Sequence, residues 1–417
     1  MSAKEVNELV RQAAIKALQE TDAEPEPELT HEVQWPVQVS IGKGLEGAIS
    51  NTTKIGYVNG AKGWLIYRGY NCFDLAEKSS YEETTYLLLF GKLPTRKELG
   101  EFSQKLVDYR PIPKKVLDVL YTIPTRETHP MSALRTAVSV LGTLDRNAED
   151  TTVEAETEVS IKLIAQMATI AAAIARLRQG KDPVEPDSKM SHAKNFLYMM
   201  TGQEPDELYE RIMDIALILH ADHGMNASTF TTMVINSSLS DMYSSVVGGI
   251  GSLKGPLHGG ANERVLYQLE EIGNPENVES WFRQAREKKV KIMGFGHRVY
   301  KAYDPRARIF GPIARLLAEK NPAIKNLYET AAKLEEVVCA ELGKEKKIFP
   351  NVDFYSGIIY KAMGIETAMF TPIFAVSRVA GWTARALEYL SDNRIFRPRA
   401  VYTGPIKMDY VPIDQRK

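Results

Sequence analysis

Along most of the chain, apolar residues recur every three or four positions, the spacing that places them on one face of an α-helix. In the segment 95–109, for example, Leu99, Phe102 and Leu106 follow this interval. A helix is predicted within the first twenty residues. Further helices are predicted at 80–90, 95–109, 131–144, 159–177, 205–220, 226–236, 241–247, 261–271, 277–288, 305–320, 323–342, 354–363 and 371–390.

One short region near the N-terminus departs from the helical spacing. Ile55, Tyr57 and Val58 precede Asn59-Gly60, and a second apolar run follows at 64–68. Asn-Gly between two apolar runs is the strongest short-range signal for a β-hairpin. Little else in the chain is typical of strands, and strands do not alternate with helices, which disfavours a doubly wound α/β fold. The predicted fold class is therefore mainly α with a small N-terminal β-hairpin region.

The first 32 residues have a different pattern from the rest of the chain. The predicted helix carries Val6, Leu9, Val10, Ala13, Ala17 and Leu18 on one broad face. An acidic, proline-containing connector follows at 21–32, and the body of the protein is expected to begin near Gln34. Acidic residues within the helix are unlike a transit peptide, and no secretory signal or run of about 18 apolar residues is present. A cytoplasmic protein is predicted, with organelle import as the alternative.

Composition narrows the classes of function. The 417 residues are 44% hydrophobic and 25% charged, as in ordinary globular proteins. The formal net charge is -1, from 52 Lys+Arg and 53 Asp+Glu, which disfavours nucleic-acid binding. Cys72 and Cys339 are too few for a disulfide framework or a cysteine zinc site, and they fit a reducing cytoplasm.

The segment 292–306 concentrates candidate chemistry. Gly294 and Gly296 allow the backbone before His297 to take conformations closed to other residues and to approach a ligand closely. Asp304 followed by proline is typical of a helix start, and Arg306 falls in the first turn. A helix N-terminus with an arginine suits an anion. The segment predicts an imidazole beside an anion site.

Other candidate groups lie at similar helix junctions: His223, His258 and Asp353. Any one of them alone is more simply a satisfied histidine or a capping carboxylate. Together with the arginines they favour proton abstraction next to a carbonyl on an anionic substrate. His220 and His223 lie three apart without an obvious third ligand, so no metal site is expected. The glycines of 248–251 do not follow a strand and indicate helix packing or a hinge rather than a nucleotide loop.

Four motifs together resemble the citrate synthase family, which includes citrate synthase and 2-methylcitrate synthase. They occur in the family's order, and the similarity runs from about residue 55 to the C-terminus. The motifs are Gly255-Pro-Leu-His-Gly-Gly-Ala-Asn262, Gly294-Phe-Gly-His-Arg-Val-Tyr-Lys-Ala-Tyr-Asp-Pro-Arg306, Pro350-Asn-Val-Asp-Phe-Tyr-Ser-Gly357 and Val376-Ser-Arg-Val-Ala-Gly381.

This resemblance implies a role for each matching residue. Asp353 is implied as the base that takes a methyl proton from acetyl-CoA, His258 as the donor to the thioester oxygen, and His297 as the partner of the oxaloacetate carbonyl. The implied oxaloacetate ligands are His223, Arg306, Arg378 and Arg397, the last reaching across from another subunit, with Arg399 as its alternative. The implied CoA-binding residues are Lys291, Ile292, Met293, Gly294, Phe295, Gly296 and Lys301.

The resemblance also implies an architecture and a reaction. The expected divisions are an N-terminal helix and extension (1–32), a large domain (33–260 and 361–417, the latter including the C-terminal tail) and a small domain (261–360). The implied reaction condenses acetyl-CoA with oxaloacetate to citrate and CoA in a homodimer or higher homo-oligomer, without a metal or redox cofactor. The alternatives are a 2-methylcitrate synthase using propionyl-CoA, a catalytically silent protein that binds CoA or an anion, and a metal-dependent hydrolase.

Overall fold

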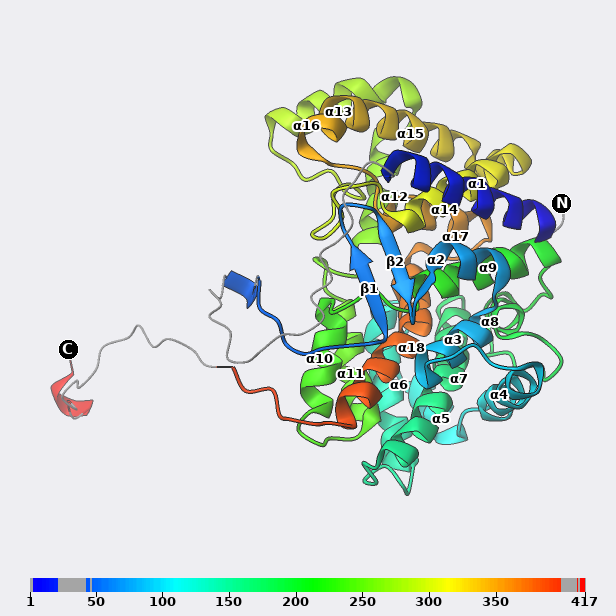
Figure 1. Ribbon diagram of the computed structural model, residues 1–417, viewed down its shortest axis with the longest axis vertical. Coiled ribbons are helices and arrows are strands. Elements are labelled where there is room, and N and C mark those ends of the chain that lie inside the picture. The colour runs from blue at the N-terminus through cyan, green and yellow to red at the C-terminus, as the bar shows by residue number, and fades with distance from the viewer. Residues whose placement is uncertain (1–2, 22–42, 46, 399–410, 412, 417) are drawn as a thin grey trace.

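The structure is a computed structural model that describes residues 3–21, 43–45, 47–398, 411 and 413–416 (Figure 1). It confirms the predicted mainly α fold. The helices are α1 (Ala3–Thr21), α2 (Cys72–Lys78), α3 (Tyr81–Phe90), α4 (Arg96–Tyr109), α5 (Lys114–Thr122), α6 (Pro130–Leu144), α7 (Val153–Arg178), α8 (His192–Thr201), α9 (Glu207–His220), α10 (Ala227–Asn236), α11 (Met242–Leu253), α12 (Ala261–Ile272), α13 (Val278–Glu287), α14 (Pro305–Lys320), α15 (Pro322–Val338), α16 (Lys344–Lys346), α17 (Val352–Ala362) and α18 (Phe370–Leu390).

Several helix ends follow from local chemistry. Thr95 and Glu98 form a capping box at the start of α4, in which each side chain accepts from the other's backbone N–H. Gly91 ends α3 in the left-handed conformation, with φ of 80°. The prediction missed α2, α5 and α8, and it ended α11 at 247, whereas that helix continues to Leu253.

The glycines that made α11 look short are packing positions. A Cβ on Gly248 would lie 2.1 Å from Ile235 Cδ1 of α10, and a Cβ on Gly249 would lie 2.4 Å from Thr232 Oγ1. Since only glycine permits this approach, tertiary contact outweighs its poor helix propensity. The prediction that 248–251 is a helix-packing element is confirmed.

The small sheet is antiparallel, in the order β1 (Gly56–Asn59), β2 (Trp64–Tyr67) and β3 (Tyr70–Asn71). The predicted hairpin is present, but Asn59 pairs with Trp64, so Asn-Gly is not the centre of a two-residue turn. Asn59 Oδ1 instead accepts hydrogen bonds from the N–H groups of Ala61 (3.0 Å) and Lys62 (2.9 Å). The third strand was not predicted.

The hairpin tip contacts the loop that carries His297. The carbonyl of Gly60 accepts from the N–H groups of Lys301 (2.9 Å) and Ala302 (3.2 Å). A Cβ at Gly60 would lie 2.1 Å from Val299 O, so the close approach requires glycine. The hairpin therefore joins the N-terminal sheet to the segment 297–303.

Helix α18 lies in the helical core, where α3, α7, α9, α10 and α11 pack against it (Figure 1). Its neighbour α7 is long and apolar enough, by length and composition, to cross a membrane. However, 83% of the most apolar window of α7 is buried inside the protein. Its alanines allow neighbouring helices to approach closely, which identifies α7 as a core helix of this fold.

Helices α12, α13, α14, α15 and α17 pack on one another at the upper end of the molecule in Figure 1. This segment corresponds to the predicted small domain, and the division itself stays a prediction. Helix α1 lies across α14 and also contacts α2 and α9. Arg308 of α14 pairs with Glu20, and Arg211 Nε of α9 donates to Asn7 Oδ1 at 2.8 Å.

The two ends of the chain can be compared with the predictions made from the sequence. Of the apolar face predicted for the first helix, Val6, Val10, Ala13 and Ala17 are buried, whereas Leu18 is 59% exposed. In the tail, the ring of Phe396 packs against those of Phe230 and Tyr389. The acidic connector was predicted at 21–32; Thr21 is the last residue of α1, and the rest of the connector, Gln34 and Arg399 lie outside the described residues.

Candidate functional site

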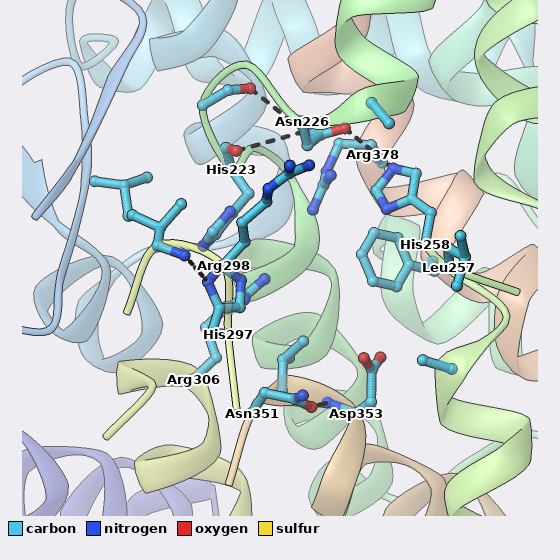
Figure 2. Close-up of a pocket in the computed structure, with 18 of the residues that line it drawn as sticks. His223, Asn226, Leu257, His258, His297, Arg298, Arg306, Asn351, Asp353 and Arg378 are labelled. Carbon is cyan, nitrogen blue, oxygen red and sulfur yellow. Dashed lines mark hydrogen bonds between the residues drawn. The ribbon is translucent and has the colours of Figure 1, made fainter. Parts of the chain in front are cut away.

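A cavity of about 710 Å³ opens where four helix junctions meet (Figure 2). Its walls come from β1, the turn after α9, the turn before α12, the loop before α14 and the starts of α14 and α17, with α18 behind. The predicted site residues that line it are His223, His258, Lys291, Gly296, His297, Arg306, Asp353 and Arg378.

The other predicted residues do not line this cavity. Ile292 and Phe295, together with Lys291, line a neighbouring cavity of about 460 Å³, which also includes Lys289 and Lys346. Met293, Gly294 and Lys301 line neither cavity. Arg397 is exposed and does not line this cavity.

Glycine geometry brings two of the predicted groups together. Gly294 and Gly296 have φ of 80° and 76°, as the sequence predicted. Between them, Phe295 forms an isolated bridge with Pro350, while Asn351 N donates to Gly294 O at 2.9 Å. The loop before His297 therefore runs beside the loop before α17, which carries Asp353.

His297 is held as a neutral hydrogen-bond donor. Its Nδ1 accepts from the backbone N–H groups of Val299 (3.0 Å) and Tyr300 (3.2 Å), so the proton of the neutral ring lies on Nε2. Burial lowers the pKa of His297 to about 4, and Arg306 and Lys301 act in the same direction. The ring can donate to a carbonyl oxygen without carrying charge.

His258 is fixed in the opposite tautomer. Ser228 N–H points at Nε2 from 3.3 Å, so that nitrogen presents a lone pair and Nδ1 carries the proton. Ser228 Oγ lies 2.8 Å from Nε2 and accepts from Trp382 Nε1 at 3.0 Å. Asn226 Oδ1, which lies 3.2 Å from the same nitrogen, accepts its hydrogen bond from Ser228 Oγ at 2.8 Å. Burial lowers the pKa of His258 to about 4, so this ring is also a neutral donor.

Asp353 lies in the first turn of α17, where its backbone N–H donates to Asn351 Oδ1 at 3.0 Å. Its side-chain Oδ1 is buried without a hydrogen-bond partner among the described residues. Burial raises the pKa of Asp353 to about 7, although the Arg306 guanidinium opposes the shift. A buried carboxylate without a strong partner is a better base than an exposed one.

Arg306 is paired within its own helix turn. Asp304 caps α14 and binds the Arg306 guanidinium through Nε (3.0 Å) and Nη2 (2.8 Å). Asp304 Oδ2 also accepts from Val352 N–H at 3.2 Å, next to Asp353. The sequence identified Asp304 as a helix cap, but its contacts with Arg306 and α17 depend on the folded chain.

Arg378 reaches the cavity from the middle of α18. Its Nε donates to His220 O at 2.6 Å, and Nη2 is buried without a partner among the described residues. Burial lowers the pKa of Arg378 to about 10, which leaves the guanidinium charged at neutral pH. An unsatisfied donor on a buried cation beside Arg306 favours an anionic ligand.

The two histidines considered for metal binding have separate environments. Helix α9 ends at His220, so His223 lies in the turn after the helix and the two side chains, although three positions apart, do not share a helix face. His220 is buried between Phe310 and Phe374, with Nδ1 2.8 Å from Ala216 O. Within the described ranges, no group of three or more His, Cys, Asp or Glu residues is placed to hold a metal ion.

Sequence reasoning missed four groups that orient the predicted residues: Asn226, Ser228, Tyr300 and Asn351. The only sequence signal for these residues is weak: each lies at a helix start or near a glycine-rich turn. Their side chains matter through contacts with residues far along the chain. The assembled cavity holds a carboxyl group of raised pKa, two neutral imidazole donors of fixed tautomer and two buried guanidinium groups. These groups are suited to taking a proton from one substrate while a second, anionic substrate is bound.

The chain is similar in sequence and in fold to proteins of one family. The family described as "Citrate synthase, C-terminal domain" matches residues 44–399. A citrate synthase of Deinococcus radiodurans is 48% identical over 91% of this chain and 100% of its own length. A 2-methylcitrate synthase of Mycobacterium tuberculosis is 40% identical over 87% of this chain and 91% of its own length. A ternary complex of carboxymethyl coenzyme A and oxaloacetate with citrate synthase from Thermoplasma acidophilum has a TM-score of 0.87 at 38% identity, covering 90% of this chain and 100% of the other.

Proposed function

The chain belongs to the citrate synthase family, whose reaction condenses acetyl-CoA with oxaloacetate to give citrate and CoA, and we propose that the residues of the 710 Å³ cavity carry out this reaction. The observation that carries the proposal is the raised pKa of Asp353, to about 7, beside two neutral histidines of opposite tautomer. We assign Asp353 as the base, His258 as the donor to the thioester oxygen and His297 as the donor to the oxaloacetate carbonyl.

The first step forms the nucleophile. Asp353 takes a proton from the acetyl methyl group, and the C–H electron pair moves into a carbon–carbon double bond as the thioester oxygen gains negative charge. A thioester methyl is a very weak acid, so that charge must be stabilised as it develops. His258 Nδ1–H supplies the hydrogen bond, while Ser228 holds the other ring nitrogen.

The second step joins the two substrates. The enolate carbon attacks the ketone carbon of oxaloacetate, and the carbonyl π-electrons move to an oxygen whose negative charge is stabilised by a hydrogen bond from His297 Nε2–H until it takes up a proton from solvent. Water then cleaves the resulting thioester to release citrate and CoA. Arg306, Arg378 and His223 bind the oxaloacetate carboxylates, because planar guanidinium groups pair well with carboxylates. The proposed chemistry requires no metal or redox cofactor, so EDTA is expected to leave the rate unchanged.

The site needs both substrates held in one place. The 460 Å³ cavity shares Lys291 with the larger one and includes Arg286, Lys289 and Lys346. We assign it to part of CoA, whose phosphates suit this basic lining. A homodimer or higher homo-oligomer, with Arg397 donated to the neighbouring subunit, and a cytoplasmic location complete the proposal.

The second candidate function is 2-methylcitrate synthesis from propionyl-CoA, supported by the 40% identical relative. One additional methyl group changes discrimination by only about 1–3 kcal/mol. The test measures CoA release with a thiol reagent from acetyl-CoA and from propionyl-CoA, with and without oxaloacetate. Citrate synthesis predicts oxaloacetate-dependent release with the higher kcat/KM for acetyl-CoA. Release without oxaloacetate would refute condensation, and a preference for propionyl-CoA would favour the second candidate.

A further inference from the structure

Tyr300 packs against the two histidines that face oxaloacetate in the proposed site, and the ring centroids of those histidines are 5.1 Å apart. Its ring centroid is 4.7 Å from that of His297 and 5.4 Å from that of His223, and only 2% of the residue is exposed. Its hydroxyl oxygen lies 3.1 Å from His223 Nε2. Figure 2 shows His223 and His297 in the cavity. Tyr300 is not among the residues that line this cavity.

The proton balance of this contact indicates which group donates. Burial raises the pKa of Tyr300 well above its usual value, so the hydroxyl keeps its proton. Burial, Arg306 and His297 lower the pKa of His223, so its ring is neutral. Among the described residues, His223 Nε2 is the one acceptor within hydrogen-bond distance of the hydroxyl. Donation in the other direction would leave a buried O–H without an acceptor, which is unfavourable.

The backbone of the same residue orients the second histidine. Tyr300 N–H donates to His297 Nδ1 at 3.2 Å, alongside Val299 N–H. The hairpin tip anchors this segment, because Gly60 O accepts from the next two N–H groups, those of Lys301 and Ala302. Tyr300 thus contacts one imidazole through its hydroxyl and the other through its main chain.

We propose that Tyr300 is a positioning residue whose hydroxyl holds His223 in the Nδ1–H tautomer. The Nδ1–H then donates to an oxygen of the anionic substrate, while the backbone of Tyr300 keeps the proton of His297 on Nε2. The imidazoles of His223 and His297 therefore each offer one N–H donor to the substrate, and because both are neutral they do not repel each other. The identity of the substrate as oxaloacetate rests on the proposed function, but the tautomer of His223 does not.

The direct test is ¹⁵N NMR of histidine-labelled protein, with the His223 signals assigned by their loss in His223→Asn. The wild-type protein is expected to show an unprotonated Nε2 and a protonated Nδ1. In Tyr300→Phe, both His223 nitrogens should shift toward values averaged between the two tautomers. A protonated Nε2 in the wild-type protein, or an unchanged tautomer in Tyr300→Phe, would overturn the proposal.

Steady-state kinetics give a second readout. Tyr300→Phe should raise KM for oxaloacetate about tenfold, which corresponds to about 1.4 kcal/mol, with kcat lowered less than about threefold. Tyr360→Phe is the matched control, since Tyr360 is equally buried and its hydroxyl has no partner among the described residues. The control should retain the wild-type KM.

A double-mutant cycle separates positioning from packing. The amide nitrogen of His223→Asn takes the place of Nδ1 and needs no tautomer control. In that background, Tyr300→Phe should change KM less than about twofold. An equal loss in both backgrounds would overturn the proposal in favour of a packing role. Failure of the wild-type protein to form citrate would refute the proposed function instead. It would not affect the NMR test of the His223 tautomer.

Discussion

At the residue scale, the cavity shows how burial changes the chemistry of ordinary side chains. Asp353 becomes more basic because its carboxylate has lost water without gaining a strong partner. His258 and His297 become less basic for the same reason, since burial disfavours their charged forms. One physical effect therefore produces both a base and two neutral donors near neutral pH.

Replacing Asp353 by asparagine tests the assigned base. Asp353→Asn keeps the shape of the side chain but cannot accept the methyl proton, so kcat should fall by about 10²–10⁴-fold. Oxaloacetate should still bind, because Arg306 and Arg378 are intact. Turnover is followed by CoA release and binding by calorimetry, with the exposed Asp392→Asn as control. Near-normal turnover in Asp353→Asn would contradict the assignment.

The raised pKa of Asp353 also predicts a pH dependence. Only the ionised carboxylate can accept a proton, and its pKa is about 7, so kcat/KM for acetyl-CoA should rise with pH up to about 7 and level off above it. The histidine pKa values of about 4 lie below this range and add no falling limb between pH 5.5 and 8. A flat profile over that range would show that Asp353 does not limit the reaction.

At the scale of elements, most of the predicted site residues lie at helix junctions, whereas Arg378 comes from the interior of α18. The hairpin tip contacts the segment 299–302, and the loop before α14 runs beside the loop before α17. These contacts join segments far apart in sequence. Loss of one contact should therefore affect the site without removing any lining side chain.

The hairpin contact can be tested by adding one methyl group. In Gly60→Ala the new Cβ would meet Val299 O at 2.1 Å, so the tip must move and lose its two hydrogen bonds to 301–302. We expect destabilisation by about 1–3 kcal/mol in urea unfolding, together with a lower kcat/KM. Gly100→Ala is the control, because no atom lies within 4 Å of its new Cβ on α4. Equal stability of the two variants would contradict the packing argument.

The packing of α7 against α11 includes a buried carboxyl that should make stability depend on pH. Glu156 of α7 accepts from Met242 N–H at 3.2 Å, its other oxygen has no partner among the described residues, and burial raises its pKa to about 8. The folded protein therefore holds a proton that the unfolded chain releases above a pKa of about 4.3. By linkage, stability falls as pH rises from about 4.3 to about 8 and changes little above that.

Glu156→Gln removes this titration, because glutamine cannot ionise. The variant should gain about 2–4 kcal/mol of stability relative to the wild-type protein as pH rises from 5 to 8. Urea unfolding at both pH values measures the difference. The exposed Glu154→Gln on the same helix should show no such gain. A constant difference between the two proteins at all pH values would refute the explanation.

At the scale of the whole molecule, helix α1 links the group of helices that contains α14 to helices α2 and α9. Helix α1 contacts α14 at the upper end of Figure 1 and α2 and α9 below it, although its connector lies outside the described residues. Movement of α14 relative to α9 would therefore involve α1 as well. The loop carrying His297 and the helix carrying Asp353 belong to the same group of packed helices as α14.

Subunit complementation tests the proposed role of Arg397 in a neighbouring site. Asp353→Asn and Arg397→Ala should each be nearly inactive as homo-oligomers. Co-expression should restore activity, because a mixed dimer then contains one site with an intact Asp353 and an intact Arg397. Arg394→Ala is the control on the same tail and should remain active by itself. Mixed oligomers without restored activity would place Arg397 outside the neighbouring site.

Much of the secondary structure and the list of candidate residues could be read from the chain because their signals are local. Helical spacing, the Thr95 capping box and the glycines at 294 and 296 depend on residues within a few positions of one another. The glycine-containing end of α11 was misread because its helix depends on contacts with Ile235 and Thr232 of α10. Local propensity cannot report such contacts.

The chemical state of the site depends on folding in a way that sequence spacing does not reveal. Ser228 selects the tautomer of His258 across 30 positions, and the carbonyl of Gly60 anchors the loop after His297 from more than 200 positions away. Residue types and motifs identify which groups are available for catalysis. Burial and distant hydrogen bonds then determine which group accepts a proton and which nitrogen donates one, because both depend on neighbours that only the folded chain brings together.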